Sequence, residues 1–138
     1  MNGRQRKKLT KRLTEAILGD DARAVAALLR RGADPSAADP DGTTPLYRAA
    51  VQGGADSVRL LLRAGAAPDT ESGSGEEGTP LCAAAAWGHD DVVQELLAHD
   101  ADPNLREDRG VGYSPLDWAL RGAHSRTADL LRAAGARG

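Results

Sequence analysis

The sequence predicts an all-α solenoid in which about four helix-turn-helix repeats stack in a row. The first observation is a period, because four columns of apolar residues recur in one register at intervals of 33, 35 and 35 residues. A fixed period of this length indicates a repeat architecture. The second is that aromatic residues make up only 3% of the chain, so its core must use Leu, Val and Ala in thin layers. The columns are Leu13, Leu46, Leu81 and Leu116; Ala16, Ala49, Ala84 and Ala119; Val25, Val58, Val93 and Ala128; and Leu28, Leu61, Leu96 and Leu131.

The clearest repeat begins at Thr79. Thr79 is a suitable N-cap, since its hydroxyl can accept from a backbone N–H of the first turn, and Pro80 fits the first helical position, where no N–H is needed. Gly88 permits the tight turn that follows, and Asp90 and Asp91 place negative charge where the next helix begins, as its dipole favours. That second helix carries an amphipathic stripe, which consists of Val92, Val93, Leu96 and Leu97.

The same pattern assigns the rest of the chain. It predicts a basic N-terminal tail (1–8) and a repeat domain (9–138), and the first unit is a cap with its inner helix at about 10–18 and a β-hairpin finger after it. Polar residues in the outer helix of the last unit are typical of a C-terminal cap that faces water. The units span roughly 9–41, 42–76, 77–111 and 112–138; the finger is 33–43; further helices are expected at 45–52, 55–64, 80–87, 90–98, 115–121 and 125–134.

Three segments resemble a known family. They read TPLYRAA at 44–50, TPLCAAA at 79–85 and SPLDWAL at 114–120, and they are similar to the ankyrin-repeat signature T-P-L-H-x-A. The turns after the outer helices, such as Gly-Ala-Asp-Pro at 32–35, resemble those of the family as well. The resemblance covers roughly 9–138 and implies stacked helix pairs with β-hairpin or loop fingers. It further implies that partner proteins contact the finger tips and the exposed positions of the inner helices.

The chain departs from the family signature at several positions. Tyr47, Cys82 and Asp117 stand where the signature has His, so the hydrogen bond of that His is lost or replaced. Asp100 occupies a turn position that the other units fill with Gly, which suits left-handed backbone better. Residues 70–78 are rich in Gly, Ser and Glu, which is typical of a flexible linker. We therefore expect modest stability and a mobile second finger.

Composition restricts the class of protein and the compartment. A chain of 138 residues with net charge -2 predicts one domain. Its single Cys82 excludes an intramolecular disulfide framework and indicates a reducing compartment. No apolar run has the length of a signal peptide or a membrane span. These features predict a cytoplasmic monomer or weak homodimer without membrane contact, and the abundance of Ala, Arg and Gly is typical of GC-rich coding, as in some bacteria.

Three patterns resemble chemical sites, and the fold explains each of them better. Residues 73–78 satisfy G-x-G-x-x-G, but they lie between helices and carry two Glu, which repel phosphate. Cys82, His89 and Asp90 could suggest a nucleophile and its base, but Cys82 takes a repeat-core position. His89 and His124 lie one repeat apart, about 8–10 Å, too far to share a zinc ion with ligand bonds of about 2 Å. The sequence predicts no enzyme, no cofactor and no metal.

Charge is distributed unevenly along the chain. Residues 69–108 contain eleven acidic residues and one basic residue, Arg106, so their net charge is -10 (eleven negative, one positive). Such a surface disfavours nucleic acid and favours a partner with a basic surface. Six basic residues lie within residues 1–12. A nucleic-acid-binding arm is one interpretation of them, and a frayed, solubilising terminus is the favoured one. They are Arg4, Arg6, Lys7, Lys8, Lys11 and Arg12.

The exposed inner-helix positions supply the candidate binding residues. Trp87 is the most informative of them, because a stacked core needs no large ring there; its alternative is to fold over neighbouring alanines. Trp, Tyr and Arg are enriched at interface hot spots, and we expect Trp87, Tyr113 and Arg121 to cluster. For Trp118, packing against Ala83 is the favoured alternative to binding. The predicted partner-binding residues are Trp87, Tyr113, Arg121, Gln52, Val51, Arg48, Trp118 and Arg109.

Together these patterns predict a non-enzymatic protein–protein interaction module. It would act as an adaptor, or as an inhibitor or regulator of one partner, and bind through a concave groove and the fingers. The alternative is a nucleic-acid-associated protein that uses the basic N-terminal arm.

Overall fold

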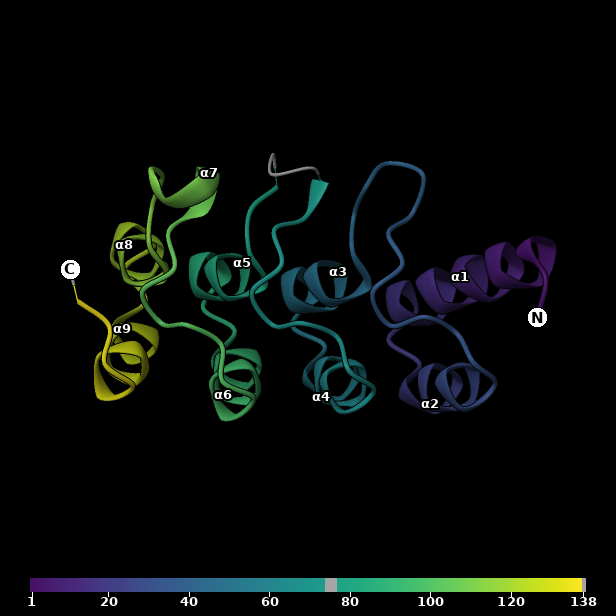
Figure 1. Ribbon diagram of the computed structural model, residues 1–138. Helices are drawn as coiled ribbons and strands as arrows, with labels where there is room; N and C mark the ends of the chain where they lie inside the picture. Colours follow the sequence, from purple (N-terminus) through teal and green to yellow (C-terminus); the bar gives the residue numbers. More distant parts are fainter. Residues whose placement is uncertain (74–76, 138) are drawn as a thin grey trace.

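The computed structural model describes residues 1–73 and 77–137, which form a row of four helix pairs (Figure 1). The two chain ends lie at opposite ends of the row. The all-α solenoid of four stacked units predicted from the sequence is therefore confirmed. The inner helices are α1 (Gly3–Leu18), α3 (Pro45–Gln52), α5 (Pro80–Trp87) and α8 (Pro115–Arg121), and the outer helices are α2 (Ala22–Arg30), α4 (Ala55–Arg63), α6 (Asp90–Ala98) and α9 (Ser125–Ala133).

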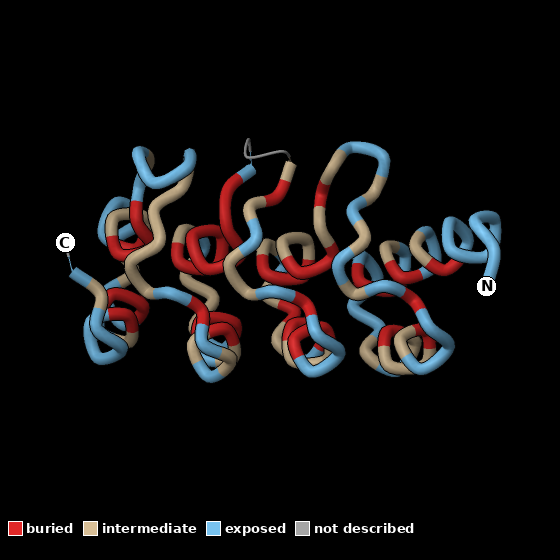
Figure 2. Tube along the Cα trace, in the orientation of Figure 1, coloured by how far each residue is buried: buried red, intermediate tan, exposed pale blue. Residues whose placement is uncertain are grey.

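Each helix packs on its equivalents in neighbouring units as well as on its own partner. The inner layer has contacts α1–α3, α3–α5 and α5–α8, and the outer layer has contacts α2–α4, α4–α6 and α6–α9. Buried residues lie mainly between the two layers (Figure 2). The predicted columns supply them: Leu13, Ala49, Leu61, Ala84, Leu96, Ala119 and Leu131 are fully buried. Among the described residues, no helix is both long and apolar enough to cross a bilayer.

The three later inner helices begin where the sequence predicts, because one cap recurs. The hydroxyls of Thr44, Thr79 and Ser114 each accept a hydrogen bond from the backbone N–H three residues on, and Pro follows each of them. The predicted bounds of α3, α5, α6 and α8 agree with the structure. α4 and α9 each end one residue earlier than predicted, at Arg63 and Ala133.

The N-terminal region differs from the prediction. α1 begins at Gly3 rather than near residue 10, so residues 3–8 belong to the helix of the first unit and not to a frayed tail. A capping box starts this helix: Oδ1 of Asn2 accepts from the Gln5 N–H at 2.9 Å, and Oε1 of Gln5 accepts from the Asn2 N–H at 3.0 Å. Arg, Gln and Lys are good helix formers, and Leu9 anchors this part of α1 in the core.

The first finger contains no pair of strands. Asp39 holds a turn there instead, since its carboxylate accepts from the N–H groups of Asp41 (2.9 Å) and Thr43 (3.1 Å). In the described part of the chain, β structure is limited to one isolated antiparallel bridge between Ser72 and Gly78. The β-hairpin predicted for the first finger is therefore replaced by a loop.

The base of the second finger is fastened to the first finger. Residues 74–76 lie outside the described residues, so the predicted mobility of this finger can be compared with its base only. There Ser72 is fully buried, and its hydroxyl donates to the Glu77 carboxylate at 2.8 Å. The Thr43 hydroxyl of the first finger donates to the same carboxylate at 2.9 Å. At these residues the finger is held by side-chain hydrogen bonds.

The turns after the outer helices share one backbone conformation. Gly32, Gly65 and Gly135 have φ of 101°, 106° and 103°, and Asp100 has φ of 68°. Asp tolerates the left-handed region better than most residues, but it does so at a cost that glycine does not carry. The expected departure at Asp100 is therefore present in the fold.

Two histidines in the turns after the inner helices α5 and α8 link neighbouring units, although the His of the family signature is absent. Nε2 of His89 lies 3.0 Å from the carbonyl oxygen of Val51, and Nε2 of His124 lies 3.0 Å from that of Ala86. Both carbonyls belong to the last turn of an inner helix, where no intrahelical donor is available. Each ring therefore closes the end of the helix in the preceding unit.

We expect His124→Ala to lower the free energy of unfolding by about 1 kcal/mol, because the part-buried Ala86 carbonyl loses its inter-unit partner. Urea unfolding followed by far-UV circular dichroism measures this change. His99→Ala is the matched control, since its Nδ1 contacts the Glu95 carbonyl within α6 rather than another unit. Losses of equal size in the two variants would contradict the inter-unit role of His124.

Candidate partner-binding groove

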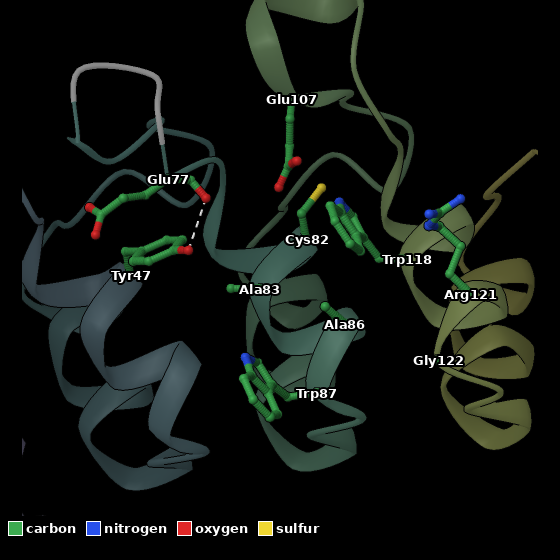
Figure 3. Close-up of a pocket in the computed structure, with 10 residues that line it drawn as sticks. All are labelled: Tyr47, Glu77, Cys82, Ala83, Ala86, Trp87, Glu107, Trp118, Arg121 and Gly122. Carbon is green, nitrogen blue, oxygen red and sulfur yellow. Dashed lines mark hydrogen bonds between the residues drawn. The ribbon is translucent and has the colours of Figure 1, made fainter.

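A hollow of about 930 Å³ opens between the described part of the second finger (66–73 and 77–78), the third finger (101–113) and the helices α3, α5 and α8. We call it the groove. Residues of three consecutive units line it, and Figure 3 shows their side chains. The lining residues are Tyr47, Glu77, Cys82, Ala83, Ala86, Trp87, Glu107, Trp118, Arg121 and Gly122.

The groove exists because small residues lie between large ones. Ala83 and Ala86 of α5 form its floor, with Tyr47 of α3 on one side and Trp118 of α8 on the other (Figure 3). In the repeat register, Ala83 is equivalent to Arg48 and Trp118, so the middle unit has a methyl group where its neighbours have long side chains. This difference in size leaves an open space above α5.

Trp87 stands at the end of the groove that is farther from the fingers. It is the last residue of α5, and it is 64% exposed. Its equivalent in the next unit is Gly122, which has no side chain to cover the ring. A ring folded over neighbouring alanines would be largely covered, so the exposure favours the interpretation of Trp87 as a contact residue.

Tyr113, Trp118 and Arg121 form a compact cluster at one wall of the groove, to which Trp118 and Arg121 contribute directly. The rings of Tyr113 and Trp118 meet edge to face, with centroids 5.1 Å apart. The Arg121 guanidinium lies over the Tyr113 ring at 4.5 Å from its centroid, within range of a cation–π interaction. The structure thus brings Tyr113 and Arg121 together as predicted, and Trp118 completes their cluster, whereas Trp87 shares the groove with Arg121 from the neighbouring unit.

Glu107 occupies the finger end of the groove. It is half-buried, and its carboxylate lies toward the Trp118 indole N–H and the Cys82 thiol (Figure 3). Burial raises the pKa of Glu107, the two donors partly offset this effect, and the negative charges of Asp108 and Glu71 raise the pKa further. The indole nitrogen of Trp118 is buried and makes no hydrogen bond of good geometry. Glu107 is therefore a carboxylic acid that is partly shielded from solvent and has acidic neighbours.

Cys82 and Tyr47 remain neutral in the groove. Burial raises the pKa of the Cys82 thiol to about 12, so at neutral pH it is not the thiolate that nucleophilic chemistry requires. Burial, followed by the charges of Glu77 and Glu107, also raises the pKa of Tyr47. Its hydroxyl donates to the Glu77 backbone carbonyl at 2.9 Å. Both groups therefore serve packing and hydrogen bonding.

Four other predicted binding residues lie outside the groove lining. Arg48 forms an ion pair with Asp39 in the first finger. Gln52 is exposed but donates from Nε2 to the Ile17 carbonyl at 2.7 Å, and Val51 is half-buried beside it. The fourth is Arg109, an exposed residue of the third finger. These side chains flank the groove or bind within the chain rather than line it.

The sequence-based list missed Tyr47 and Glu107. In the sequence, Tyr47 stands out only as a replacement for the signature His, although its ring lies beside the groove floor that α5 of the next unit forms. Glu107 is one of the eleven acidic residues of the segment 69–108, and nothing in the segment distinguishes it from the others. Its position depends on α7 (Glu107–Gly110), a short turn in which Asp108 and Arg109 have left-handed backbone. No pattern in the sequence predicts this left-handed backbone at Asp108 and Arg109.

We expect Glu107→Gln to raise the free energy of unfolding at pH 7. Because the pKa of Glu107 is higher in the folded chain, its protonated form stabilises the fold; that contribution is complete below the unfolded pKa near 4.5 and is lost as pH rises through the folded pKa. Gln is neutral at every pH and retains the contribution. Urea unfolding of both proteins should therefore show a gain at pH 7 that shrinks toward pH 4.5. A gain of equal size at both pH values would contradict this account.

Comparison with known proteins agrees with the geometry. Stacked helix pairs with looped fingers define a helical-repeat domain. The family model for ankyrin repeats (3 copies) matches residues 13–107 and 69–137, and the chain belongs to this family. Ankyrin repeats generally act as protein–protein interaction modules.

One relative is a potassium channel, KOR1 of rice (Oryza sativa subsp. japonica), which is 42% identical over 60 residues. The alignment covers 44% of this chain and 7% of the channel protein. The similarity is thus to a small part of a much longer protein.

Proposed function

We propose that this chain is a non-enzymatic adaptor or regulator that binds a partner protein through the groove. The observation that carries the proposal is Trp87, a large ring that is 64% exposed at the end of an alanine-floored hollow. A ring in this position costs free energy in water and contributes little to the core, which is typical of an interface residue. Arg121, exposed on the opposite wall, offers a second residue of the type enriched at hot spots.

The acidic fingers support a partner with a basic surface. Asp69, Glu71, Asp102 and Asp108 belong to the second and third fingers, which border the groove. A concentration of one charge around a concave site attracts the opposite charge and speeds association at low salt. A reducing compartment such as the cytoplasm suits the buried Cys82, and one chain per complex or a weak homodimer fits this mode of binding.

Substitution of Trp87 and Arg121 tests the proposal. We expect the double variant Trp87→Ala with Arg121→Ala to weaken partner capture at least about tenfold, because two central contacts are removed. The fold should be retained, since both side chains are exposed, and far-UV circular dichroism checks this. Capture is measured with the immobilised protein in host lysate, followed by mass spectrometry. The control is Val111→Ala, which shortens an apolar side chain that is 85% exposed and does not line the groove. Unchanged capture by a folded double variant would reject the groove as the site.

The alternative is nucleic-acid binding by the basic face of α1. It is favoured by one observation: Arg4, Lys7, Lys8 and Lys11 are all exposed on a regular helix. Phosphate contacts of this kind weaken steeply as salt increases. A titration with duplex DNA and with RNA at about 50 mM salt tests this alternative, because phosphate contacts are strongest at low salt and binding should be tight there. The binding should disappear in the triple variant Lys7→Gln, Lys8→Gln, Lys11→Gln. Absence of binding at that salt concentration would remove the alternative.

A further inference from the structure

The finger end of the groove combines aromatic walls with a carboxylate. Tyr47 and Trp118 stand on either side of the small Ala83, and the Glu107 side chain reaches toward the space between them (Figure 3). Aromatic faces and an acid are the two groups that stabilise an organic cation in a protein site. The arrangement here brings both to one concave place.

The backbone of the third finger holds Glu107 in this position. The Glu107 N–H donates to the Tyr113 carbonyl at 3.0 Å, and the Gly112 N–H donates to the Glu107 carbonyl at 2.8 Å. Gly78 of the second finger makes room for the carboxylate, since a Cβ at that residue would overlap with Glu107 Oε1. The acid is thus anchored by main-chain hydrogen bonds and by a close approach of two fingers.

Arg106, which precedes Glu107 in the chain, and Arg121, which lines the groove, both contact other groups. Arg106 donates to the Gly112 carbonyl (3.1 Å) and to the Asp117 carboxylate (3.2 Å). Arg121 lies over the Tyr113 ring. Within residues 1–73 and 77–137, none of the ion pairs includes Glu107. The carboxylate therefore faces the groove without a cation from the described chain.

We infer that the space between Tyr47, Trp118 and Glu107 receives an arginine side chain of the partner protein. This inference rests on the proposed function and names the chemistry of its groove. A planar guanidinium can stack on an aromatic face while its N–H groups donate to a carboxylate, a combination that the compact ammonium of lysine does not offer. The acidic fingers add a field that draws a basic segment toward the site. An acidic segment would meet Glu107, Glu71 and Asp108 and be repelled.

Short peptides of defined charge test the arginine subsite directly. The probes are acetylated, amidated Gly-Ser heptapeptides with one central residue, either arginine, lysine, citrulline or glutamate. The two indole N–H signals in a ¹⁵N-resolved NMR spectrum report binding, because the chain contains two Trp, and Trp87→Phe identifies the signal of Trp118. We expect the arginine peptide to shift the Trp118 signal saturably at about millimolar concentration, lysine to bind more weakly, and citrulline and glutamate to leave it unchanged.

Two variants with the same change of charge complete the test. Glu107→Gln should weaken binding of the arginine peptide at least about fivefold, whereas Asp108→Asn, which alters the adjacent exposed acid, should change it less than about twofold. A similar response to citrulline and arginine would overturn the inference, as would equal losses in the two variants. A third outcome separates the two proposals. If the Trp87 and Arg121 double variant no longer captures the partner but the arginine peptide does not shift the Trp118 signal, the groove remains the binding site and the arginine subsite is refuted.

Discussion

Leu96→Ala is expected to lower the free energy of unfolding by about 3–5 kcal/mol, the largest stability change that we predict for a single substitution. Leu96 is fully buried in α6, which packs on α4, α5 and α9, so the lost methyl groups leave a cavity at the junction of two units. A four-unit array has little stability in reserve, and each unit contacts its neighbours only. Urea unfolding monitored by circular dichroism measures the loss.

The control for Leu96 is Leu120→Ala, which makes the same chemical change on α8, where the side chain is 51% exposed. We expect it to cost less than about 1 kcal/mol. The Leu96 variant should also lose amide hydrogen-exchange protection first in α8 and α9, because the broken junction separates them from the rest of the row. Uniform loss of protection in all helices would contradict this nearest-neighbour account.

The second large effect comes from replacing alanine by leucine at two positions of α5, one of which should affect folding and the other binding. Ala84→Leu should cost about 3 kcal/mol, since Ala84 is fully buried where α5 meets α3, α6 and α8 and a larger group would overpack that junction. Ala86→Leu should change stability by less than about 1 kcal/mol, because Ala86 is half-buried in the groove floor and Leu is a good helix former.

Binding is expected to respond to Ala86→Leu although the fold does not. The added side chain occupies the floor between Tyr47 and Trp118, so a partner that enters the groove should lose at least about tenfold in affinity. Capture from host lysate, with the folded variant checked by circular dichroism, measures this effect. A stable Ala86→Leu protein with undiminished capture would show that the partner binds elsewhere. Together with Ala84→Leu, it distinguishes alanines that serve stacking from alanines that shape the site.

The helices could be predicted closely because their signals are local. Thr79 and Pro80 specify where α5 begins through hydrogen bonds within one turn, and the recurring apolar columns set which face of each helix is buried. The early start of α1 has a local signal too, the Asn2 and Gln5 capping box, but the run of basic residues that follows is equally typical of a frayed tail. Short-range pairing thus accounts for nearly all of the secondary structure.

The candidate site could be predicted only in part. Exposure of Trp87 followed from its register in the repeat, since a position after the alanine pair faces away from the core. The groove around it did not follow, because its walls come from Tyr47 and Trp118, which lie 71 residues apart (118 minus 47). Side chains brought together over such separations depend on how the units stack, and the spacing of motifs contains no measure of that.

The row of helix pairs could be inferred from the amino-acid sequence, because caps, turns and columns each act within a few residues or recur at one fixed interval. The position of Glu107 in the groove could not be inferred in this way, since it depends on how the fingers fold and approach one another. Its place depends on left-handed backbone at Asp108 and Arg109 and on the missing side chain of Gly78 in another finger. The physical reason is that helices are stabilised by neighbours along the chain, whereas a binding site is built from neighbours in space.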